Sequence, residues 1–299
     1  MFKGWKRNKG AGKSNGEPVK STVALVDHQH VDYEIVVSMQ SDVGCVREIN
    51  EDSGRYTQPD EEQAAGGKGL LVLVADGMGG HSAGEVASKM AVELISRVYY
   101  EEKTDARHAL EAGFHAANKA INDWSANDER VSGMGTTCTA LVLRDGLAIA
   151  AHVGDSRLYL IRNGQIYLMT EDHSAVMEMV KQGLISLNEA RHHPEKNVIL
   201  RALGSHPEVE VTIWDTPLPV RAGDMFLLCS DGLYDLVEDE EIKQLSVASA
   251  PFAACENLIA LAKQRGGHDN ITVAIVRLEA IGAVDARPAP ATRQVEAAK

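Results

Sequence analysis

The stretch "LLVLVADGMGGH", residues 70–81, has six apolar residues that stop at Asp76, and three glycines follow within the next four positions. A continuous apolar run of this length predicts a strand that is buried on both faces. Burial in a medium of low dielectric constant disfavours an ionised carboxylate. A buried strand that ends on Asp76 therefore needs a partner for that charge, and the rest of the chain indicates what the partner is.

Three further aspartates stand at the ends of apolar runs: Asp231 after "MFLLCS", Asp155 after "AIAAHVG" and Asp269 before "ITVAIV". Any one of them could be an ordinary turn residue, because Asp-Gly is a common turn dipeptide. Four carboxylates gathered at low dielectric constant would repel one another and partly protonate. A hard divalent cation such as Mg²⁺ or Mn²⁺ removes that penalty, since it prefers carboxylate, carbonyl and water oxygens.

The remaining pattern alternates strands and helices in a mixed order. Residues 84–100 and 105–124 have apolar side chains at helical spacing. Residues 136–154 and 156–170 fold around Asp-Gly and Asn-Gly, which are strong hairpin signals. Further predicted elements are a polar helix at 173–190, a helix at 252–265, and strands at 33–40, 69–75, 210–215, 225–231 and 270–278. Hairpins mean antiparallel pairing, so the predicted fold is an α+β sandwich of two stacked sheets with helices outside.

Composition excludes several classes of protein. A net charge of −13 over 299 residues argues against a general nucleic-acid binder. No apolar stretch approaches the roughly 20 residues that span a bilayer. Four cysteines without close spacing are typical of reduced thiols in a cytoplasmic protein. We expect a domain at 31–280 between two disordered tails, the basic residues 1–30 and the Ala/Pro-rich residues 281–299.

A fifth acidic cluster lies in "VREINEDS", where Arg47 stands close to Glu51 and Asp52. An arginine beside carboxylates is usually part of a surface ion pair. The alternative is a phosphate-binding site, because the guanidinium group presents donors that match two phosphate oxygens. The sequence leaves both interpretations open at this point.

Taken in order, eight motifs resemble those of the bacterial metal-dependent protein serine/threonine phosphatases of type 2C. They are "RxxNED" (47–52), "ADGMGGH" (75–81), "GMGTT" (133–137), "HVGDSR" (152–157), "DHS" (172–174), "RALG" (201–204), "CSDGLYD" (229–235) and "GGHDNIT" (266–272). Each motif alone is weakly diagnostic, but eight in the right order are very specific. The resemblance covers about residues 34–278.

The resemblance implies a four-layer α-β-β-α sandwich of two mainly antiparallel sheets flanked by helix pairs, with two or three Mn²⁺ or Mg²⁺ ions at one end. The metal ligands it implies are Asp76, the Gly77 carbonyl, Asp231, Asp269 and, for a third ion, Asp155. Glu51 and Asp52 would hold metal-bound waters or stand behind the ligands, Arg47 would bind the phosphate, and Thr136 and Asn270 would support the site. Residues 174–208 correspond to a variable flap beside the active site.

The function implied by the resemblance is hydrolysis of phosphoserine and phosphothreonine by a metal-bridging hydroxide, with Arg47, Asp76, Asp231 and Asp269 as the catalytic set. The expected partners are phosphorylated proteins, including a serine/threonine kinase, and we expect a monomer. Some relatives carry a histidine where this chain has Met78, so the acid that protonates the leaving group stays unassigned. A non-catalytic scaffold and a phosphatase or phosphodiesterase for small molecules remain as alternatives.

Overall fold

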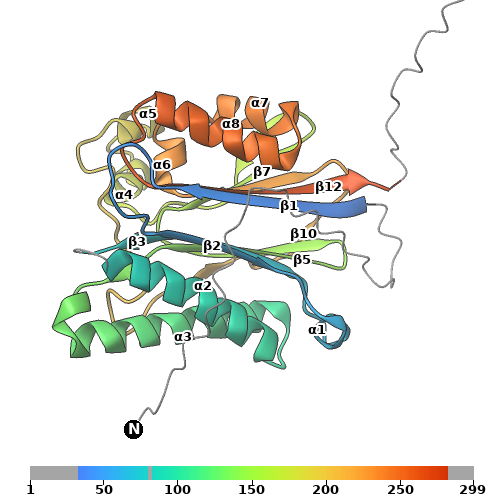
Figure 1. Ribbon diagram of the computed structural model, residues 1–299, viewed down its shortest axis with the longest axis horizontal. Helices are drawn as coiled ribbons and strands as arrows, with labels where there is room; N and C mark the ends of the chain where they lie inside the picture. Colours follow the sequence, from blue (N-terminus) through green and yellow to red (C-terminus); the bar gives the residue numbers. More distant parts are fainter. Residues whose placement is uncertain (1–32, 80–82, 282–299) are drawn as a thin grey trace, which may run out of the picture.

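The computed structural model describes residues 33–79 and 83–281, so the predicted tail 1–30 and all of the predicted tail 281–299 except Ile281 lie outside the described residues. Figure 1 shows four layers, in which two sheets face each other and a pair of helices covers the outer face of each. The predicted α+β sandwich is therefore confirmed.

One sheet has the strand order β1-β12-β11-β7-β8. The bounds of these strands are β1 (Tyr33–Asp42), β12 (Ile271–Ala280), β11 (Met225–Cys229), β7 (Arg157–Arg162) and β8 (Gln165–Leu168). Its helix pair is α7 (Asp239–Ala248) and α8 (Pro251–Gln264), drawn at the top of Figure 1. All of its strand pairs are antiparallel.

The other sheet has the order β10-β6-β5-β3-β2, and β4 and β9 pair with β3 and β6 at its margins. The bounds are β10 (Leu218–Pro219), β6 (Leu147–Val153), β5 (Cys138–Arg144), β3 (Leu70–Met78), β2 (Asp52–Thr57), β4 (Gly135–Thr136) and β9 (Thr212–Ile213). Its outer face is covered by α2 (Ala83–Glu101) and α3 (Ala106–Asn127), at the bottom of Figure 1.

The apolar run at 70–75 is explained by the position of β3 between two cores. Leu71, Leu73 and Ala75 pack against the α2–α3 helices. Val72 and Val74 point the other way and pack against the facing sheet. Since successive side chains of a strand alternate between faces, a strand with a core on each side needs apolar residues at every position.

The two predicted hairpins form as expected. Asp145 and Gly146 join β5 to β6 with φ angles of 49° and 73°, and Asn163 and Gly164 join β7 to β8 with 54° and 74°. Two successive left-handed residues make the tight turn whose twist matches that of the flanking strands. Asparagine, aspartate and glycine tolerate this region better than other residues.

Two element predictions were wrong. The single helix predicted at 173–190 is two short helices, α4 (Ala175–Lys181) and α5 (Leu187–Arg191), because Gly183 turns the chain at a φ of 70°. The strand predicted at 210–215 is reduced to the two residues of β9. The structure also has elements that we did not predict: β2, β4, β10, α7, and the short helices α1 (Glu61–Ala65), α6 (Asp231–Tyr234) and 129–131.

Candidate metal centre

The antiparallel order of the strands brings the predicted ligands to one end of the sandwich, on the left in Figure 1 beside α6. In one sheet β2 begins where β3 ends, so Asp52 is the register partner of Asp76. In the other, β11 ends beside the start of β12, so Asp231 lies next to the segment that carries Asp269. The approach there is close enough that a Cβ atom added to Gly232 would lie 2.1 Å from the Asn270 carbonyl oxygen.

The carboxylates at this end repel one another. Burial raises the pKa of Asp76 well above its ordinary value, and the charges of Asp52, Asp231, Asp155 and Asp269 raise it further. Burial likewise raises the pKa of Asp231 well above its ordinary value, helped by the charge of Asp155. The pKa of Asp52 is raised to about 6, and burial is again the largest cause. A set of side chains that all resist ionisation in this way is a place where a cation is favourable.

Asp155 joins the group from the turn between β6 and β7. It is 3% exposed, and burial together with the charge of Asp172 raises its pKa to about 7. Asp155 is also the largest charge contribution to the raised pKa of Asp231. The two carboxylates are therefore close enough for their charges to interact. The assignment of Asp155 to a third ion stays a prediction.

Several oxygens of the group are buried without a hydrogen-bond partner. Of nine such side-chain atoms in the described part of the chain, four belong to this set: Glu51 Oε1, Asp52 Oδ1, Asp155 Oδ1 and Asp231 Oδ1. Burying a hydrogen-bond acceptor without a partner costs free energy, and the cost is larger if the acceptor is charged. The donor set is all oxygen, so it fits a hard divalent cation such as Mn²⁺ or Mg²⁺.

The carboxylates are not yet in a coordinating arrangement. Among residues 33–79 and 83–281, no three His, Cys, Asp or Glu side chains form a group that could hold a metal ion as they stand. A bound cation would offset the mutual repulsion of these carboxylates. The ligand set therefore remains a prediction, which the experiments below test.

Glycines let the backbone approach the centre closely. A Cβ atom at Gly77 would lie 2.1 Å from the Gly84 carbonyl oxygen and 2.5 Å from that of Glu51. A Cβ atom at Gly84 would lie 2.6 Å from Glu51 Oε1. The glycine after Asp76 is thus required by packing, and it leaves the backbone of residue 77 beside the acidic group.

Arg47 is half exposed at the rim of the group. Its Nη2 donates to Asp269 Oδ2 at 2.8 Å, and its Nη1 lies 3.9 Å from Glu51 Oε2. The structure therefore contains an ion pair at Arg47, the first of the two interpretations that the sequence left open. A guanidinium group at the edge of the carboxylates is also placed to bind a phosphate, so the second interpretation stays open.

The two predicted supporting residues both contact the backbone of the centre. Thr136 donates from Oγ1 to the Asp76 carbonyl oxygen at 2.8 Å. The Asn270 amide accepts from the Glu51 backbone N–H at 2.7 Å and donates to the carbonyl oxygens of Val43 and Ile49, each at 3.0 Å. Asn270 thereby fixes the loop that carries Arg47 and Glu51.

Sequence reasoning missed a group of hydroxyl residues behind the carboxylates. Ser230 donates to Asp52 Oδ2 at 2.7 Å and accepts from the Thr272 N–H at 2.9 Å. Thr137 accepts from the Asp76 N–H at 2.9 Å and shares a 2.7 Å hydrogen bond with Ser156. Ser230 and Ser156 each stand beside a predicted ligand in the sequence, and this adjacency was the available signal.

The chain is similar in sequence to known proteins. The model of the family described as "Protein phosphatase 2C" matches residues 50–265. A "Serine/threonine phosphatase stp" of Listeria monocytogenes is 38% identical over 243 residues, covering 79% of this chain and 93% of that protein. The Mycobacterium tuberculosis "Serine/threonine protein phosphatase PstP" is 40% identical over 237 residues, covering 79% of this chain and 43% of that longer protein.

A solved structure of a related phosphatase has the same fold. The catalytic domain of PstP "in complex with 2 Manganese ions" superposes with a TM-score of 0.71 at 37% identity, covering 82% of this chain and 98% of that one. The chain therefore belongs to the protein phosphatase 2C family. Within the described residues, no helix is both long and apolar enough to cross a membrane.

Proposed function

We propose that this protein is a metal-dependent protein serine/threonine phosphatase, which hydrolyses phosphoserine and phosphothreonine with Mn²⁺ or Mg²⁺ as cofactor. The observation that carries this proposal is the gathering of carboxylates at one end of the sandwich, where they raise one another's pKa and several of their oxygens are buried without a hydrogen-bond partner. The names of the relatives and the manganese-bound structure support it. The scaffold alternative is weakened because all the predicted ligand residues are present.

The residues that we propose to hold the metals are the carboxylates of Asp76, Asp231 and Asp269, the Gly77 carbonyl and, for a third ion, Asp155. Glu51 and Asp52 act through water or behind the ligands. A pair of divalent cations supplies charge neutralisation and a water molecule whose pKa is lowered towards neutrality. Asp76 lies in β3 and Asp231 begins α6 directly after β11, so the fold holds both carboxylates in place and little reorganisation is needed during the reaction.

Arg47 has a separate role, which is to bind the phosphate group. Its exposed guanidinium can leave Asp269 and donate to two phosphate oxygens. It then orients the phosphorus atom towards the acidic group and offsets the charge of the phosphate oxygens. The physiological substrates that we propose are phosphorylated proteins, among them a serine/threonine kinase, and we propose that the enzyme acts as a cytoplasmic monomer.

The experiment that tests this function is phosphate release from a phosphothreonine peptide by the full-length protein. We expect release with Mn²⁺ and none after addition of EDTA, with recovery when excess Mn²⁺ is restored. Failure to release phosphate at any Mn²⁺ concentration would favour the scaffold alternative. Turnover of only a cyclic phosphodiester would favour the phosphodiesterase alternative.

Replacing Arg47 by alanine is expected to raise KM by about 10-fold and to lower kcat by no more than about threefold, because it removes a contact that substrate and transition state share. Steady-state kinetics on a phosphopeptide measure both constants. Arg130→Ala is the matched control, since Arg130 is exposed and pairs with Asp128 away from the centre. A loss confined to kcat would argue against the phosphate contact.

Replacing Ser230 by alanine is expected to weaken Mn²⁺ binding by about 10- to 100-fold, the usual effect of removing a group that orients a ligand. The reason is that Asp52 Oδ2 loses the 2.7 Å hydrogen bond from the Ser230 hydroxyl. Ser246→Ala is the matched control, since Ser246 is equally buried but its hydroxyl has no hydrogen-bond partner among the residues that the structure describes. Calorimetric titration with Mn²⁺ measures the effect, and equal affinities in the two variants would refute this role for Ser230.

A further inference from the structure

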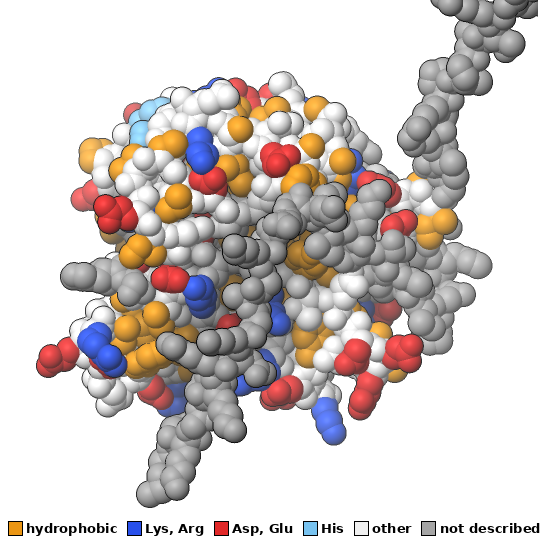
Figure 2. Space-filling view, viewed as in Figure 1, with side chains coloured by type: hydrophobic (Ala, Val, Ile, Leu, Met, Phe, Trp, Pro, Cys, Tyr) orange, Lys and Arg blue, Asp and Glu red, His pale blue; other side chains and the backbone are white. Residues whose placement is uncertain are grey.

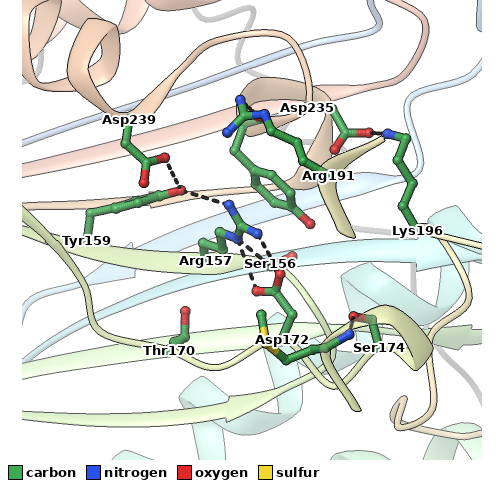
Figure 3. A network of polar contacts seen from close by, with 12 residues as sticks. Ser156, Arg157, Tyr159, Thr170, Asp172, Ser174, Arg191, Lys196, Asp235 and Asp239 are labelled. Carbon is green, nitrogen blue, oxygen red and sulfur yellow. Dashed lines mark hydrogen bonds and ion pairs between the residues drawn. The ribbon is translucent and has the colours of Figure 1, made fainter. Parts of the chain in front are cut away.

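A cavity of about 180 Å³ adjoins the metal centre and lies under residues 174–208. Its walls come from several parts of the chain. Asp155 forms the side shared with the metal centre, α4 and α5 contribute Val176 and Leu187, and the segment after Asp231 contributes Tyr234 and Asp239. We call this cavity the flap pocket; Figure 3 shows most of the polar residues of its walls.

The size of the flap pocket limits its ligand. Pockets for cofactors and comparable small molecules occupy about 300–1,000 Å³. A cavity of 180 Å³ is too small for such a ligand and is suited to a single amino-acid side chain. Because it shares Asp155 with the metal centre, a side chain bound there would belong to the same polypeptide as the phosphorylated residue.

The cations in the walls of the flap pocket are already neutralised. Arg157 makes a two-pronged ion pair with Asp172, with hydrogen bonds of 2.6 to 3.2 Å, and its guanidinium stacks on the ring of Tyr234 at 3.7 Å. Lys196 pairs with Asp235. Figure 3 shows both pairs on the walls of the cavity.

The remaining cation, Arg191, is also satisfied. It donates from Nη2 to the carbonyl oxygens of Tyr234 at 2.6 Å and Val237 at 3.2 Å, and its Nη1 lies 3.1 Å from Glu238 Oε2. The flap is thereby tied to the residues that follow Asp231. Arg191 therefore has little capacity left to attract an acidic ligand.

Two carboxylates in the walls have no such partner. Asp239 accepts a 3.1 Å hydrogen bond from the neutral hydroxyl of Tyr159, and Asp155 Oδ1 is buried without a partner. In the described part of the chain neither carboxylate forms an ion pair with a cationic side chain. The uncompensated charge of the flap pocket is therefore negative, even when a metal ion takes Asp155.

The rest of the wall is apolar, with Leu168, Val176, Met177, Leu187 and Ala190. A ligand with an aliphatic stem and a cationic end matches both features, because lysine and arginine lay their methylene groups on apolar surface and keep the charge at the tip. We propose that the flap pocket binds the side chain of a lysine or arginine that flanks the phosphorylated residue of the substrate. This inference rests on the proposed phosphatase function and names one element of its substrate preference.

Other side chains fit less well. An acidic side chain would meet Asp239 with no free cation to receive it. A purely apolar side chain would cover the carboxylate of Asp239 and remove it from water, which is unfavourable without a compensating charge. The uncompensated charge of Asp239 thus favours a basic residue. The apolar wall favours a long side chain whose methylene groups can pack against it.

The test uses the full-length protein with Mn²⁺ and phosphothreonine peptides in an alanine background. A single lysine is moved through the positions on either side of the phosphothreonine, and kcat/KM is measured from phosphate release. Each variant's values are divided by its own turnover of p-nitrophenyl phosphate, which has no cationic side chain for Asp239 to attract. We expect one or more lysine positions to raise kcat/KM by about fivefold over alanine, the size typical of a partly exposed ion pair.

The decisive variant is Asp239→Asn, which removes the charge but keeps an oxygen that can accept from Tyr159. We expect it to lose the preference for lysine. Glu240→Gln is the matched control, because it removes a charge from the next residue, which is exposed and pairs with Lys243. Preference in the wild type and in Glu240→Gln, with loss in Asp239→Asn, supports the proposal.

Three results would overturn the inference: the same lysine preference in Asp239→Asn, no lysine preference at any position, or a preference for glutamate. In each of these cases the peptides are still hydrolysed, so the phosphatase function stands. Absence of turnover of both the peptides and p-nitrophenyl phosphate would overturn the function, and the inference with it. The two failures are therefore distinguishable.

Discussion

Replacing Asp231 by asparagine is expected to lower kcat by at least about 100-fold in the presence of Mn²⁺, since it removes a charged ligand from the metal pair. The same substitution is expected to raise the melting temperature of the metal-free protein. Burial and the neighbouring Asp155 disfavour the ionised form of Asp231, and an amide of the same shape removes that repulsion. Activity and metal-free stability should thus change in opposite directions.

Steady-state kinetics and thermal unfolding, with and without Mn²⁺, measure the two effects. Asp224→Asn is the matched control, because Asp224 is also buried but pairs with Arg162 at 2.7 and 2.6 Å. Removing that charge leaves the guanidinium of Arg162 without its ion-pair partner, so we expect lower stability in the control. If Asp231→Asn kept a wild-type rate, or destabilised the metal-free protein as Asp224→Asn does, the assignment of Asp231 as a ligand would be wrong.

Replacing Gly77 by alanine is expected to abolish Mn²⁺-dependent activity and to lower the stability of the fold. The added methyl group would lie 2.1 Å from the Gly84 carbonyl oxygen and 2.5 Å from that of Glu51. Both are backbone atoms, which cannot rotate away as a side chain can, so α2 or the loop before β2 must move. Overpacking of this kind costs about 1–3 kcal/mol or more.

Chemical denaturation measures the stability of the Gly77→Ala variant, and Mn²⁺ titration measures its site. Gly66→Ala is the control, because Gly66 has an ordinary φ of −73° and its added Cβ would approach no closer than 3.3 Å to another atom. We expect that control to keep its activity. An active Gly77→Ala variant would show that the backbone at this position does not shape the centre.

The parts of the fold that the sequence predicts are those with a local physical cause. The tight turns at Asp145-Gly146 and Asn163-Gly164 need left-handed residues, and the sequence supplies them. The continuous apolar run of β3 follows from a core on each side. Local signals of this kind do not depend on which distant segments the element later contacts.

The elements that were missed owe their structure to distant contacts. β2, "DSGRYT", has no apolar alternation and becomes a strand because β3 pairs with it. α7 begins with three acidic residues, which suit the positive end of a helix dipole but give no apolar period.

The single helix predicted at 173–190 was wrong for a local reason. The prediction ignored Gly183, although a glycine within a helical pattern is a visible sign of a break.

In the candidate site, too, the features with a local signal were predicted and those that depend on distant contacts were not. The carboxylates at strand ends were visible, because each follows or precedes an apolar run. The contact between Ser230 and Asp52 was not, because it joins residues 178 positions apart. Likewise, the sequence alone did not decide between an ion pair and a phosphate contact for Arg47, since Asp269, its partner in the structure, lies 222 positions away.

Calorimetric titration of the full-length protein with Mn²⁺ tests the central claim most directly. The proposed ligation by Asp76, Asp231 and Asp269 predicts uptake of at least two ions per chain, the number in the solved complex of the related PstP domain. Asp76→Asn should weaken that uptake severely, whereas Asp224→Asn should leave it unchanged in the folded protein. Absence of measurable Mn²⁺ or Mg²⁺ uptake by the wild type, or equal uptake by Asp76→Asn, would contradict the account.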